Sequence, residues 1–337
     1  MQPLHQTAIV ILNWNGKSYL EKFLPGIIKN SNDSAVYVAD NNSTDDSVPF
    51  LRTNFPQIQI INIERNYGFA KGYNFALSKI VATYFIILNN DVEVSPGWLS
   101  PLIEHLKNNN VTAACQPKIM DLNRREYFEY AGAAGGFVDK LYYPFCRGRI
   151  FSCLEKDEGQ YNDTCEIFWA SGACMAVRSD VFFQFGGFDE NFFAHQEEID
   201  LCWRMKNAGY KIMYIPESVV YHKGAGTLAK SNPRKTYLNF RNSLIMVYKN
   251  LHFPKSCGII VARLFLDGLA GMNFLVAGKL FDCIAIIRAH FSFYSGLNKW
   301  KRNVNKRNDL YLTGRISKSI VWGYFFRGRK TFGDYGV

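Results

Sequence analysis

The sequence predicts an α/β protein with a mostly parallel central sheet and helices on both faces of that sheet. Up to about residue 230, short apolar segments of strand length alternate with segments whose apolar residues recur at helical spacing. Strands of parallel sheets are buried on both faces and therefore appear as continuous apolar runs. The chain has 337 residues and 48% hydrophobic content, which is ample for such an interior.

The predicted strands and helices alternate in a regular order along the chain. The segment between the first two strands has apolar residues at helical spacing, and Pro49 fits the next helix only in its first turn. We expect strands at residues 7–12, 35–40, 58–63 and 84–88, with helices at 16–30, 41–55 and 69–80.

Polar residues follow three of these strands at their carboxyl ends. Open α/β sheets bind ligands at that edge, so the strand ends are the candidate site. Turn formation and helix capping would explain each group by itself, but their occurrence together favours a binding site. The groups are Asn13 with Trp14, Asn15 and Gly16; Asp40 with Asn41, Asn42, Ser43 and Thr44; and Asn89 with Asn90 and Asp91.

Seven segments, in order, resemble the successive motifs of the family 2 glycosyltransferases, especially the rhamnosyltransferase-like branch that builds bacterial surface polysaccharides. The resemblance covers residues 7–250 and implies a GT-A (Rossmann-like) fold, a nucleotide-sugar donor, a divalent metal and inversion at the anomeric carbon. We expect a catalytic domain at 1–250 and a helical C-terminal region at 251–337. The segments are ILNWNG, VADNNSTDDS, NYGFAKGYNFAL, IILNNDVEV, FWASGACMAVRSDVF, GGFDENFF and HQEEIDLCWRMKNAGYKI.

Asn89 and Asp91 stand where the family has its DxD metal motif. Mg²⁺ or Mn²⁺ bound there would neutralise the negative charge that builds on the departing diphosphate. Because Asn89 is neutral, only Asp91 supplies a charged ligand. His222 resembles the family histidine that completes the metal site, although a histidine after a strand is more often an ordinary polar loop residue.

The resemblance also implies a donor site. Asp40 resembles the acid that accepts a hydrogen bond from the base or ribose, with Asn42 beside it, Asn13 and Trp14 flanking the base, and Asn90 at the same edge. A turn and ordinary helix packing would require the same glycines that permit close approach of the nucleotide. The residues expected to border the nucleotide are Asn66, Gly68, Phe69, Gly72 and Asn74.

Inverting transfer requires a base that takes the proton of the acceptor hydroxyl. Residues 197–209 predict a helix that begins at Glu197 and has Gly209 just beyond its end. Glu197, Glu198 and Asp200 then lie in its first turn, where the helix dipole favours acids. They match the family's E-D-x-D pattern, whose second position supplies the base. That position is Glu198 here, one methylene longer than the usual Asp, and Asp200 is the alternative.

An acceptor-side segment is expected at Trp169, Ser171 and Gly172, which resemble the part of the family site where an aromatic ring stacks on a sugar. A buried structural tryptophan is the alternative.

Basic residues are concentrated at the C-terminal end of the chain. The net charge is +10, and residues 288–337 contain eleven Lys and Arg but two Asp. The preceding segment, 256–287, is apolar but interrupted by charges, and its longest uncharged stretch is shorter than the 20 or so residues that cross a bilayer. We expect Gly268, Gly271 and Gly278 to divide it into short helices, with Arg263 and Asp267 paired one turn apart.

These features predict helices that lie in a membrane interface, with the aromatic and basic residues of 291–307 at headgroup level. An ordinary helical subdomain that packs on the core is the alternative. Eight cysteines without a CxxC pair and no recognisable export signal favour a cytoplasmic enzyme, peripheral on the inner face of the cytoplasmic membrane.

The expected partners are a dTDP- or UDP-sugar, a glycan or lipid-linked oligosaccharide acceptor, and an anionic membrane surface. Nucleic acid is not expected, because the basic residues adjoin an apolar segment instead of forming a polar face. Two other functions stay open at this point: a sugar-nucleotide pyrophosphorylase, and a non-catalytic nucleotide- or carbohydrate-binding scaffold.

Overall fold

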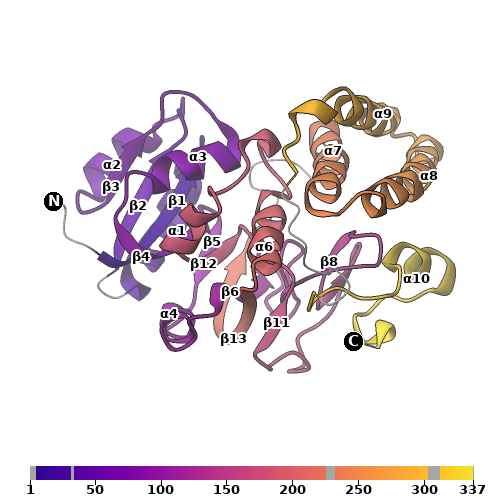
Figure 1. Ribbon diagram of the computed structural model, residues 1–337. Helices are drawn as coiled ribbons and strands as arrows, with labels where there is room; N and C mark the ends of the chain where they lie inside the picture. The colour runs from indigo at the N-terminus through magenta and orange to yellow at the C-terminus, as the bar shows by residue number, and fades with distance from the viewer. Residues whose placement is uncertain (1–4, 32–33, 225–231, 303–311, 337) are drawn as a thin grey trace.

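The computed structural model describes residues 5–31, 34–224, 232–302 and 312–336. A central sheet organises the first two thirds of the chain (Figure 1). Its strand order in the described residues is β11-β13-β6-β12-β4-β1-β2-β3, and β5 pairs with β13. The strands are β1 His5–Asn13, β2 Ala35–Asp40, β3 Gln59–Asn62, β4 Ala82–Asn89, β5 Val92–Val94, β6 Thr112–Asp121, β11 Cys165–Ile167, β12 Cys174–Arg178 and β13 Lys211–His222.

The sheet is parallel in its N-terminal half, where β3, β2, β1 and β4 run side by side. β6 and β13 form a second parallel pair, and antiparallel β12 joins the two groups. The predicted α/β class with a mostly parallel sheet is therefore confirmed. The strands and helices expected between residues 7 and 88 are all present. Their ends agree within three residues, except that the helix expected at 41–55 begins only at Ser47.

Both faces of the sheet are buried, as continuous apolar strands require. Along β1, Ala8 and Val10 face one core, while Ile9 and Ile11 face the other. The first core is covered by α3 Gly68–Leu77, α5 Ser179–Gln184 and α6 Glu197–Asn207, and the second by α1 Lys17–Asn30, α2 Ser47–Asn54 and α4 Leu99–Asn108.

Strand register brings the polar ends together. Asn13 of β1 is aligned with Asp40 of β2, and Leu12 is aligned with Asn89 of β4. On the other side of the sheet, His222 at the end of β13 pairs with Val92, one residue after Asp91. Side chains far apart in the sequence therefore meet at a single edge.

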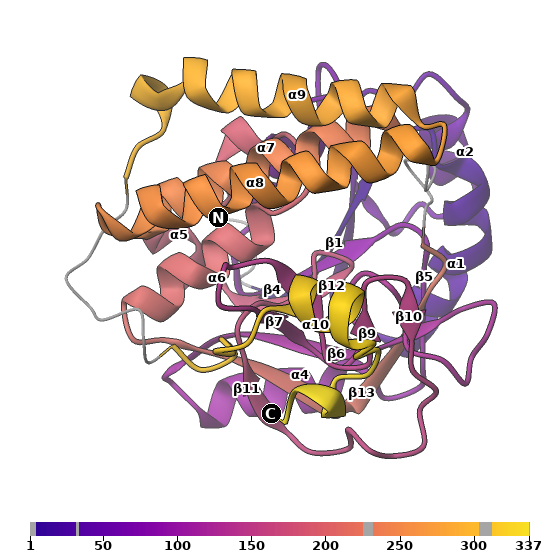
Figure 2. The ribbon, with the colours of Figure 1, turned by 90° about the vertical axis from the view of Figure 1, so that its right-hand side faces the viewer.

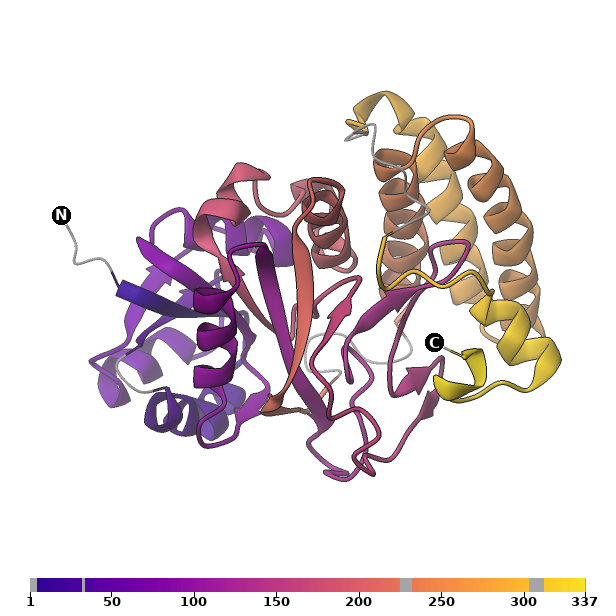
Figure 3. The same ribbon diagram turned by 60° about the horizontal axis from the view of Figure 1, so that its bottom comes forward.

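A small second sheet lies next to the central sheet, and the part of the chain up to residue 224 that contains both sheets is called the catalytic half below, after the domain expected from the sequence. Its strands are β7 Gly136–Val138, β8 Pro144–Cys146, β9 Arg149–Ile150 and β10 Cys153–Leu154, with a 3₁₀ turn at Glu190–Phe192 elsewhere on the same half. The C-terminal segment returns to this sheet, as Figure 3 shows: Ile316 donates a backbone hydrogen bond to Val138, and Phe332 packs on Phe137. This segment contains α10 Ile320–Arg327 between the 3₁₀ turns Leu297–Lys299 and Gly333–Tyr335.

Three long helices form a bundle beside the catalytic half: α7 Pro233–Asn250, α8 Lys255–Val276 and α9 Leu280–Ser295. Figure 2 shows α8 and α9 running side by side along one side of the molecule. The predicted division of α8 at Gly268 and Gly271 is wrong. A helix tolerates single glycines at about 1 kcal/mol each, and the chain turns only at Gly278, where φ is +70°.

At 22 residues, α8 is long and apolar enough to cross a membrane. Its buried residues recur every three to four positions and include Arg263 and Asp267. Asp267 accepts a hydrogen bond from Tyr143 Oη at 2.9 Å and lies 3.0 Å from His290 Nε2. Arg263 donates to the Ser243 carbonyl. The charged face of α8 therefore packs on protein.

Candidate active site

Asparagine side chains tie the ends of β1 and β4 together. Asn90 Nδ2 donates to Asn13 Oδ1 at 2.9 Å, and Asn13 Nδ2 lies 3.3 Å from Asp40 Oδ1. A Cβ at Gly16 would come within 2.3 Å of Asn90 Nδ2 and 2.4 Å of Asn13 Oδ1, so only glycine lets the chain pass over this pair. The bridge explains why polar amides end these strands.

The Asp40 carboxylate is occupied by its own loop. It accepts hydrogen bonds from the Ser43 backbone at 2.9 Å and from Ser43 Oγ at 2.6 Å, and it is buried. Asn42 adopts a left-handed conformation and is exposed. Trp14 is 42% exposed beside this loop, so it offers a free aromatic face at the expected donor end.

The predicted nucleotide-bordering segment contributes mostly to packing. Asn66 Oδ1 accepts from Asn41 Nδ2 and from the Gly68 backbone. Gly68 has φ +76°, and a Cβ there would contact Phe193 at 2.6 Å. Gly72 lies against Leu12 of β1.

Asn74 corrects the sequence prediction for this segment. Its amide donates to the Phe188 carbonyl at 2.8 Å and accepts from the Phe188 backbone at 2.9 Å. Both ends of the amide hold the loop at Phe188, so Asn74 has a packing role in this structure. Phe69 lies in the aromatic cluster next to it, 5.8 Å from Phe188 between ring centroids.

Asp91, His222 and Asn89 converge at the end of β4. His222 Nε2 lies 3.1 Å from Asp91 Oδ1 and 3.4 Å from Asn89 Nδ2. Rotation of the Asn89 amide would present its oxygen at the same point. A carboxylate, an amide and an imidazole nitrogen thus meet in one place, and this set of donors suits a divalent cation.

Glu129 lies behind the histidine and was missed by the sequence analysis. Its Oε2 is 3.3 Å from His222 Nδ1 and accepts a hydrogen bond from the Ala131 backbone. Because Glu129 faces the opposite ring nitrogen, it cannot share a cation with Asp91. Consistent with this, the described residues contain no cluster of three or more His, Cys, Asp or Glu side chains that could hold a metal together. Glu129 instead forms an ion-pair contact with the far ring nitrogen, on the side from which carboxylates orient metal-binding histidines.

Glu129, His222 and Asp91 stand in a row, and their charges shift the pKa values of His222 and Asp91. Burial lowers the pKa of His222, but the Glu129 and Asp91 carboxylates outweigh it and raise that pKa to about 10. Burial also opposes ionisation of Asp91, yet His222 holds its pKa below the usual value. Asp91 is therefore a carboxylate at neutral pH.

Three residues in the left-handed region precede the first turn of α6. Phe193, His195 and Gln196 have φ values of +64°, +71° and +76°. Such conformations cost on the order of 1 kcal/mol or more for each residue that is not glycine. Asn242 of α7 compensates: its Nδ2 donates to the carbonyls of Phe192, Ala194 and His195 at 3.0, 2.9 and 2.8 Å.

This clamp positions two glutamates at the start of α6. Each has one buried carboxylate oxygen, Oε2, without a hydrogen-bond partner in the structure. Burial raises the pKa of Glu198 to about 7. Burial, and then the charge of Glu198, raise the pKa of Glu197 well above its ordinary value. Glu198 is the less buried of the two.

Asp200 does not suit the role of alternative base. It is fully buried and accepts from Arg204 Nε at 2.8 Å and from Asn250 Nδ2 at 2.8 Å, with Lys249 Nζ at 3.2 Å. Burial opposes its ionisation, but Lys249 and Arg204 hold its pKa below the usual value. A carboxylate so stabilised is a weak proton acceptor, and its contacts anchor α6 to α7.

The expected acceptor residues are also packed inside the protein. Trp169 is 4% exposed, donates from Nε1 to the Phe137 carbonyl, and lies flat against Gly136. Ser171 donates to the Ala131 carbonyl at 2.6 Å and is buried. Trp169 therefore has no exposed ring face on which a sugar could stack in this structure, and its burial favours the alternative of a structural tryptophan. Gly172 lies against Phe69.

Glu129 and Glu198 both lie near the same buried cysteine, Cys146. Burial raises the pKa of Cys146, and Glu129 and Glu198 are both close enough to add to this effect while Arg149 opposes it. Glu129 in turn contacts His222. Glu198 of α6 and the Glu129 that contacts His222 are thus both neighbours of Cys146. Glu129 had no motif, and the only signal for it was an acid shortly after β6.

The chain matches glycosyl transferase family 2 over residues 8–183. It is 25% identical over 235 residues to N-acetylglucosaminyl-diphospho-decaprenol L-rhamnosyltransferase of Mycobacterium tuberculosis, an alignment that covers 65% of this chain and 76% of that protein. It is 23% identical over 222 residues to rhamnosyltransferase WbbL of Escherichia coli, covering 64% and 82%.

Among solved structures, GalNAc-T7 with UDP, GalNAc and Mn²⁺ is similar with a TM-score of 0.59 at 18% identity, over 73% of this chain and 49% of that one. This likeness confirms the GT-A fold. None of these matches supports the pyrophosphorylase or the binding-scaffold alternative.

Proposed function

Because the chain belongs to glycosyl transferase family 2, we propose that this glycosyltransferase moves a sugar from a nucleotide-sugar donor to a hydroxyl of a lipid-linked glycan, with inversion. The observation that carries the proposal is Glu198, whose buried Oε2 has no hydrogen-bond partner and whose pKa burial raises to about 7. Glu198 also acts on the same cysteine, Cys146, as Glu129, which contacts His222. A general base works best when its pKa is near the operating pH.

Glu198 is the base of this reaction. It accepts the proton of the acceptor hydroxyl while that oxygen forms a bond to the anomeric carbon. The bond from the anomeric carbon to the diphosphate oxygen breaks on the opposite side, and its electrons leave with the nucleoside diphosphate. Burial of Glu198 keeps its pKa high enough for proton transfer.

A divalent metal fits the residues at the end of β4. Asp91, the Asn89 amide and His222 Nε2 would hold it, with His222 giving up its proton on binding. The mixed nitrogen and oxygen ligands favour Mn²⁺ over Mg²⁺. When bound, the cation neutralises the negative charge of the departing diphosphate. Glu129 keeps the imidazole turned toward this position. The GalNAc-T7 structure, which was solved with Mn²⁺, supports this assignment.

The donor is a UDP- or dTDP-sugar, and rhamnose is the sugar named for the two relatives described above. The exposed face of Trp14 and the loops at Asn13, Asn42 and Asn90 border the base and ribose. Asp40 accepts two hydrogen bonds from Ser43 and so fixes the conformation of this loop. The backbone groups of the loop then contact the donor.

A broad apolar surface supports attachment to a membrane. Side chains of α8 and α9 that face away from the protein are large, apolar and exposed, with Phe265 at 68% and Phe281 at 73%. Soluble proteins rarely leave apolar patches of this extent uncovered. The surface is formed by Val261, Leu264, Phe265, Leu269, Met272, Leu275, Val276, Leu280, Phe281, Ile284, Ile287 and Phe291, with Trp322, Phe325 and Phe326 of α10.

This surface favours helices that lie in the membrane interface over a helix that crosses the membrane. Crossing would expose Arg263 and Asp267 to hydrocarbon, where charges are costly, whereas they now contact Ser243, Tyr143 and His290. We place the protein on the inner face of the cytoplasmic membrane, with residues 1–250 as the catalytic domain and the membrane-facing helices in 251–337. The basic residues between 303 and 307 lie outside the described residues.

A transfer assay tests the proposal directly. The protein is incubated with Mn²⁺, a UDP-, dTDP- or GDP-sugar, and a bacterial lipid extract that contains prenyl-diphosphate-linked sugars. We expect nucleoside diphosphate release that depends on both lipid and metal, and a product whose anomeric configuration is opposite to that of the donor. Full activity in EDTA would refute the metal role, and a retained configuration would refute inversion. Release that no lipid extract stimulates would refute the lipid-linked acceptor.

A further inference from the structure

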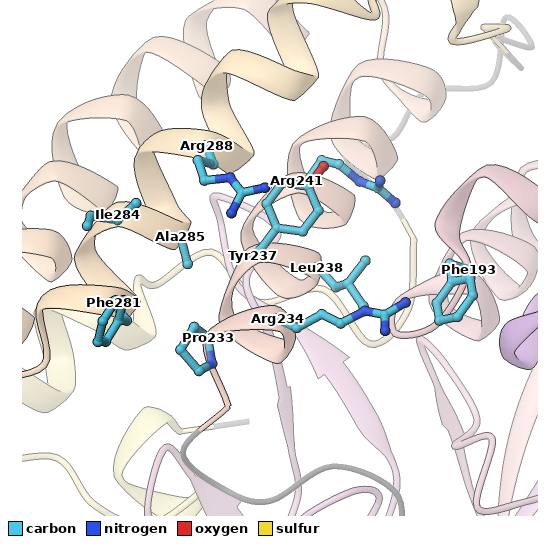
Figure 4. A pocket seen from close by; sticks show the side chains of 10 residues that line it. All are labelled: Phe193, Pro233, Arg234, Tyr237, Leu238, Arg241, Phe281, Ile284, Ala285 and Arg288. Carbon is cyan, nitrogen blue, oxygen red and sulfur yellow. The ribbon is translucent and has the colours of Figure 1, made fainter. Parts of the chain in front are cut away.

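A groove of about 570 Å³ runs between α7 and α9 and plays no part in the site described above. Tyr237 and Leu238 of α7 contribute to its lining, as Figure 4 shows. One side is apolar and the other is basic. The remaining lining residues are Phe193, Pro233, Arg234, Arg241, Phe281, Ile284, Ala285 and Arg288.

Three arginines make the basic side. Arg241 is fixed, because its Nη2 donates to the Asn191 and Phe192 carbonyls. Arg234 lies over the Phe193 ring at 4.8 Å, and Arg288 lies 6.0 Å from the Tyr237 ring. Within the described ranges, no carboxylate forms an ion pair with either of these two guanidinium groups. They are therefore available to an anion, and a guanidinium binds phosphate oxygens in a bidentate manner.

The apolar side opens toward the proposed membrane surface. Phe281 and Ile284 line the groove and are also part of the exposed face of α9. A hydrocarbon chain that leaves the groove on this side would remain in contact with apolar side chains.

The basic side leads toward the catalytic half. Phe193, next to Arg234, accepts hydrogen bonds through its carbonyl from the backbones of Phe69 and Ala70 at the start of α3. Phe193 is also the first of the three residues with positive φ that lead into the first turn of α6, where Glu198 lies. Figure 4 shows the Arg234 side chain extending toward Phe193, away from Phe281 and Pro233.

We propose that this groove binds the phosphate-bearing linkage of a lipid-linked acceptor, with the diphosphate at Arg234 and Arg288, the hydrocarbon chain along Phe281 and Ile284, and the sugar directed past Phe193 toward Glu198. This inference rests on the proposed function, since it names the part of the acceptor that the enzyme recognises. The order of groups in the groove, apolar then basic then catalytic, matches the order of groups in such a lipid.

Farnesyl diphosphate is a suitable probe, because it carries a short isoprenoid chain and a diphosphate. Its binding is measured by calorimetry in EDTA, so that the cation-dependent site cannot hold the diphosphate. We expect the Arg234→Ala/Arg288→Ala protein to bind it at least about tenfold more weakly than the wild type, because two charge-assisted contacts are lost. Arg234→Lys/Arg288→Lys should restore part of the affinity. Farnesol, which lacks the diphosphate, should bind weakly to all variants.

The Arg52→Ala/Lys107→Ala protein is the matched control. It loses the same charge from α2 and α4, where both side chains are exposed, and should bind farnesyl diphosphate as the wild type does. Equal affinity in the groove variant and the wild type, or equal binding of farnesol, would overturn the proposal. The proposal would also be overturned if the groove variant lost only its binding to phosphatidylglycerol vesicles, because the arginines would then bind the anionic membrane surface in general.

Binding of UDP with Mn²⁺, measured on the same samples, separates this inference from the proposed function. Wild-type protein that binds farnesyl diphosphate but no nucleotide or nucleotide sugar would contradict the proposed function and leave the groove intact. Normal nucleotide binding and sugar transfer with no effect of the arginine substitutions would contradict the groove alone.

Discussion

Replacement of Glu198 with Gln removes the proposed base while it keeps the size and polarity of the side chain. Loss of a general base typically lowers kcat by about 10²- to 10⁴-fold. The KM for the donor should change little, because the amide leaves the end of β4 untouched. In the wild type, kcat should fall as the pH drops below about 7, since burial raises the pKa of Glu198 to that value and only the carboxylate accepts a proton. The variant should lack this dependence.

The same substitution should stabilise the folded protein at high pH. A rise in the Glu198 pKa from 4.5 to about 7 corresponds to a cost of up to about 3 kcal/mol for ionising this group in the folded state. At pH 4 the carboxyl is protonated in both the folded and the unfolded chain, so the cost is absent. Between about pH 4.5 and 7 the unfolded chain loses the proton first, and the free energy of unfolding falls. The Gln variant has no such loss.

The assay pairs turnover with thermal unfolding at pH 5 and pH 8. Glu197→Gln is the matched control, because burial raises the pKa of that carboxyl too. It should gain stability at pH 8 in the same way but keep kcat within about tenfold of the wild type.

Three results would refute this reasoning. Wild-type turnover in Glu198→Gln would remove the residue from the base role. A Glu197→Gln variant that is inactive while Glu198→Gln is active would move the base to Glu197. Equal stability of Glu198→Gln and the wild type at pH 8 would show that the glutamate is not desolvated as the structure describes.

Three further predictions concern the metal site and the membrane surface. Asp91→Ala should abolish the Mn²⁺-dependent part of UDP binding in calorimetry, and unchanged binding would exclude a metal ligand there. Glu129→Gln should weaken Mn²⁺ affinity about 10- to 100-fold with little change in metal-free UDP binding; a large loss of thermal stability with normal metal affinity would show a purely structural role. Phe265→Asp with Phe281→Asp should release the protein from anionic vesicles in a flotation assay, since burial of each phenylalanine contributes about 1.5 to 3 kcal/mol, whereas Val81→Asp on the opposite half should not.

The fold was predictable because its signals are local. A strand such as Ala82–Asn89 is apolar on both faces, and α6 ends where Gly209, with φ +101°, follows its last turn. The ordered motifs identified the family for the same reason, since each is a short segment with its own composition. The glycines of α8 gave no sign that the helix is continuous. Packing of Arg263 and Asp267 against the protein stabilises α8 by more than the glycines destabilise it.

The candidate site was only partly predictable. Asp91 follows the end of β4 and Glu198 lies in the first turn of α6, so the sequence could name both acids, and their roles stay predictions. The sequence could not show whether a polar side chain already has an ion-pair or hydrogen-bond partner, because such partners come from residues far along the chain. Asp200 forms an ion pair with Lys249, and Asn74 donates a hydrogen bond to the Phe188 carbonyl. The residues next to Asp200 and Asn74 in the sequence did not predict these contacts.

The sequence by itself determined that this protein is an α/β glycosyltransferase, because hydrophobic period, turn chemistry and motif order are properties of short segments. The tertiary structure decided which carboxylates are free and which are paired, that Glu129 lies behind His222, and that three arginines of α7 and α9 line one groove with apolar side chains. The physical reason is that burial and charge pairing depend on distances in space, and residues far apart in the chain, such as Glu129 and His222, acquire such a distance only when the sheet forms.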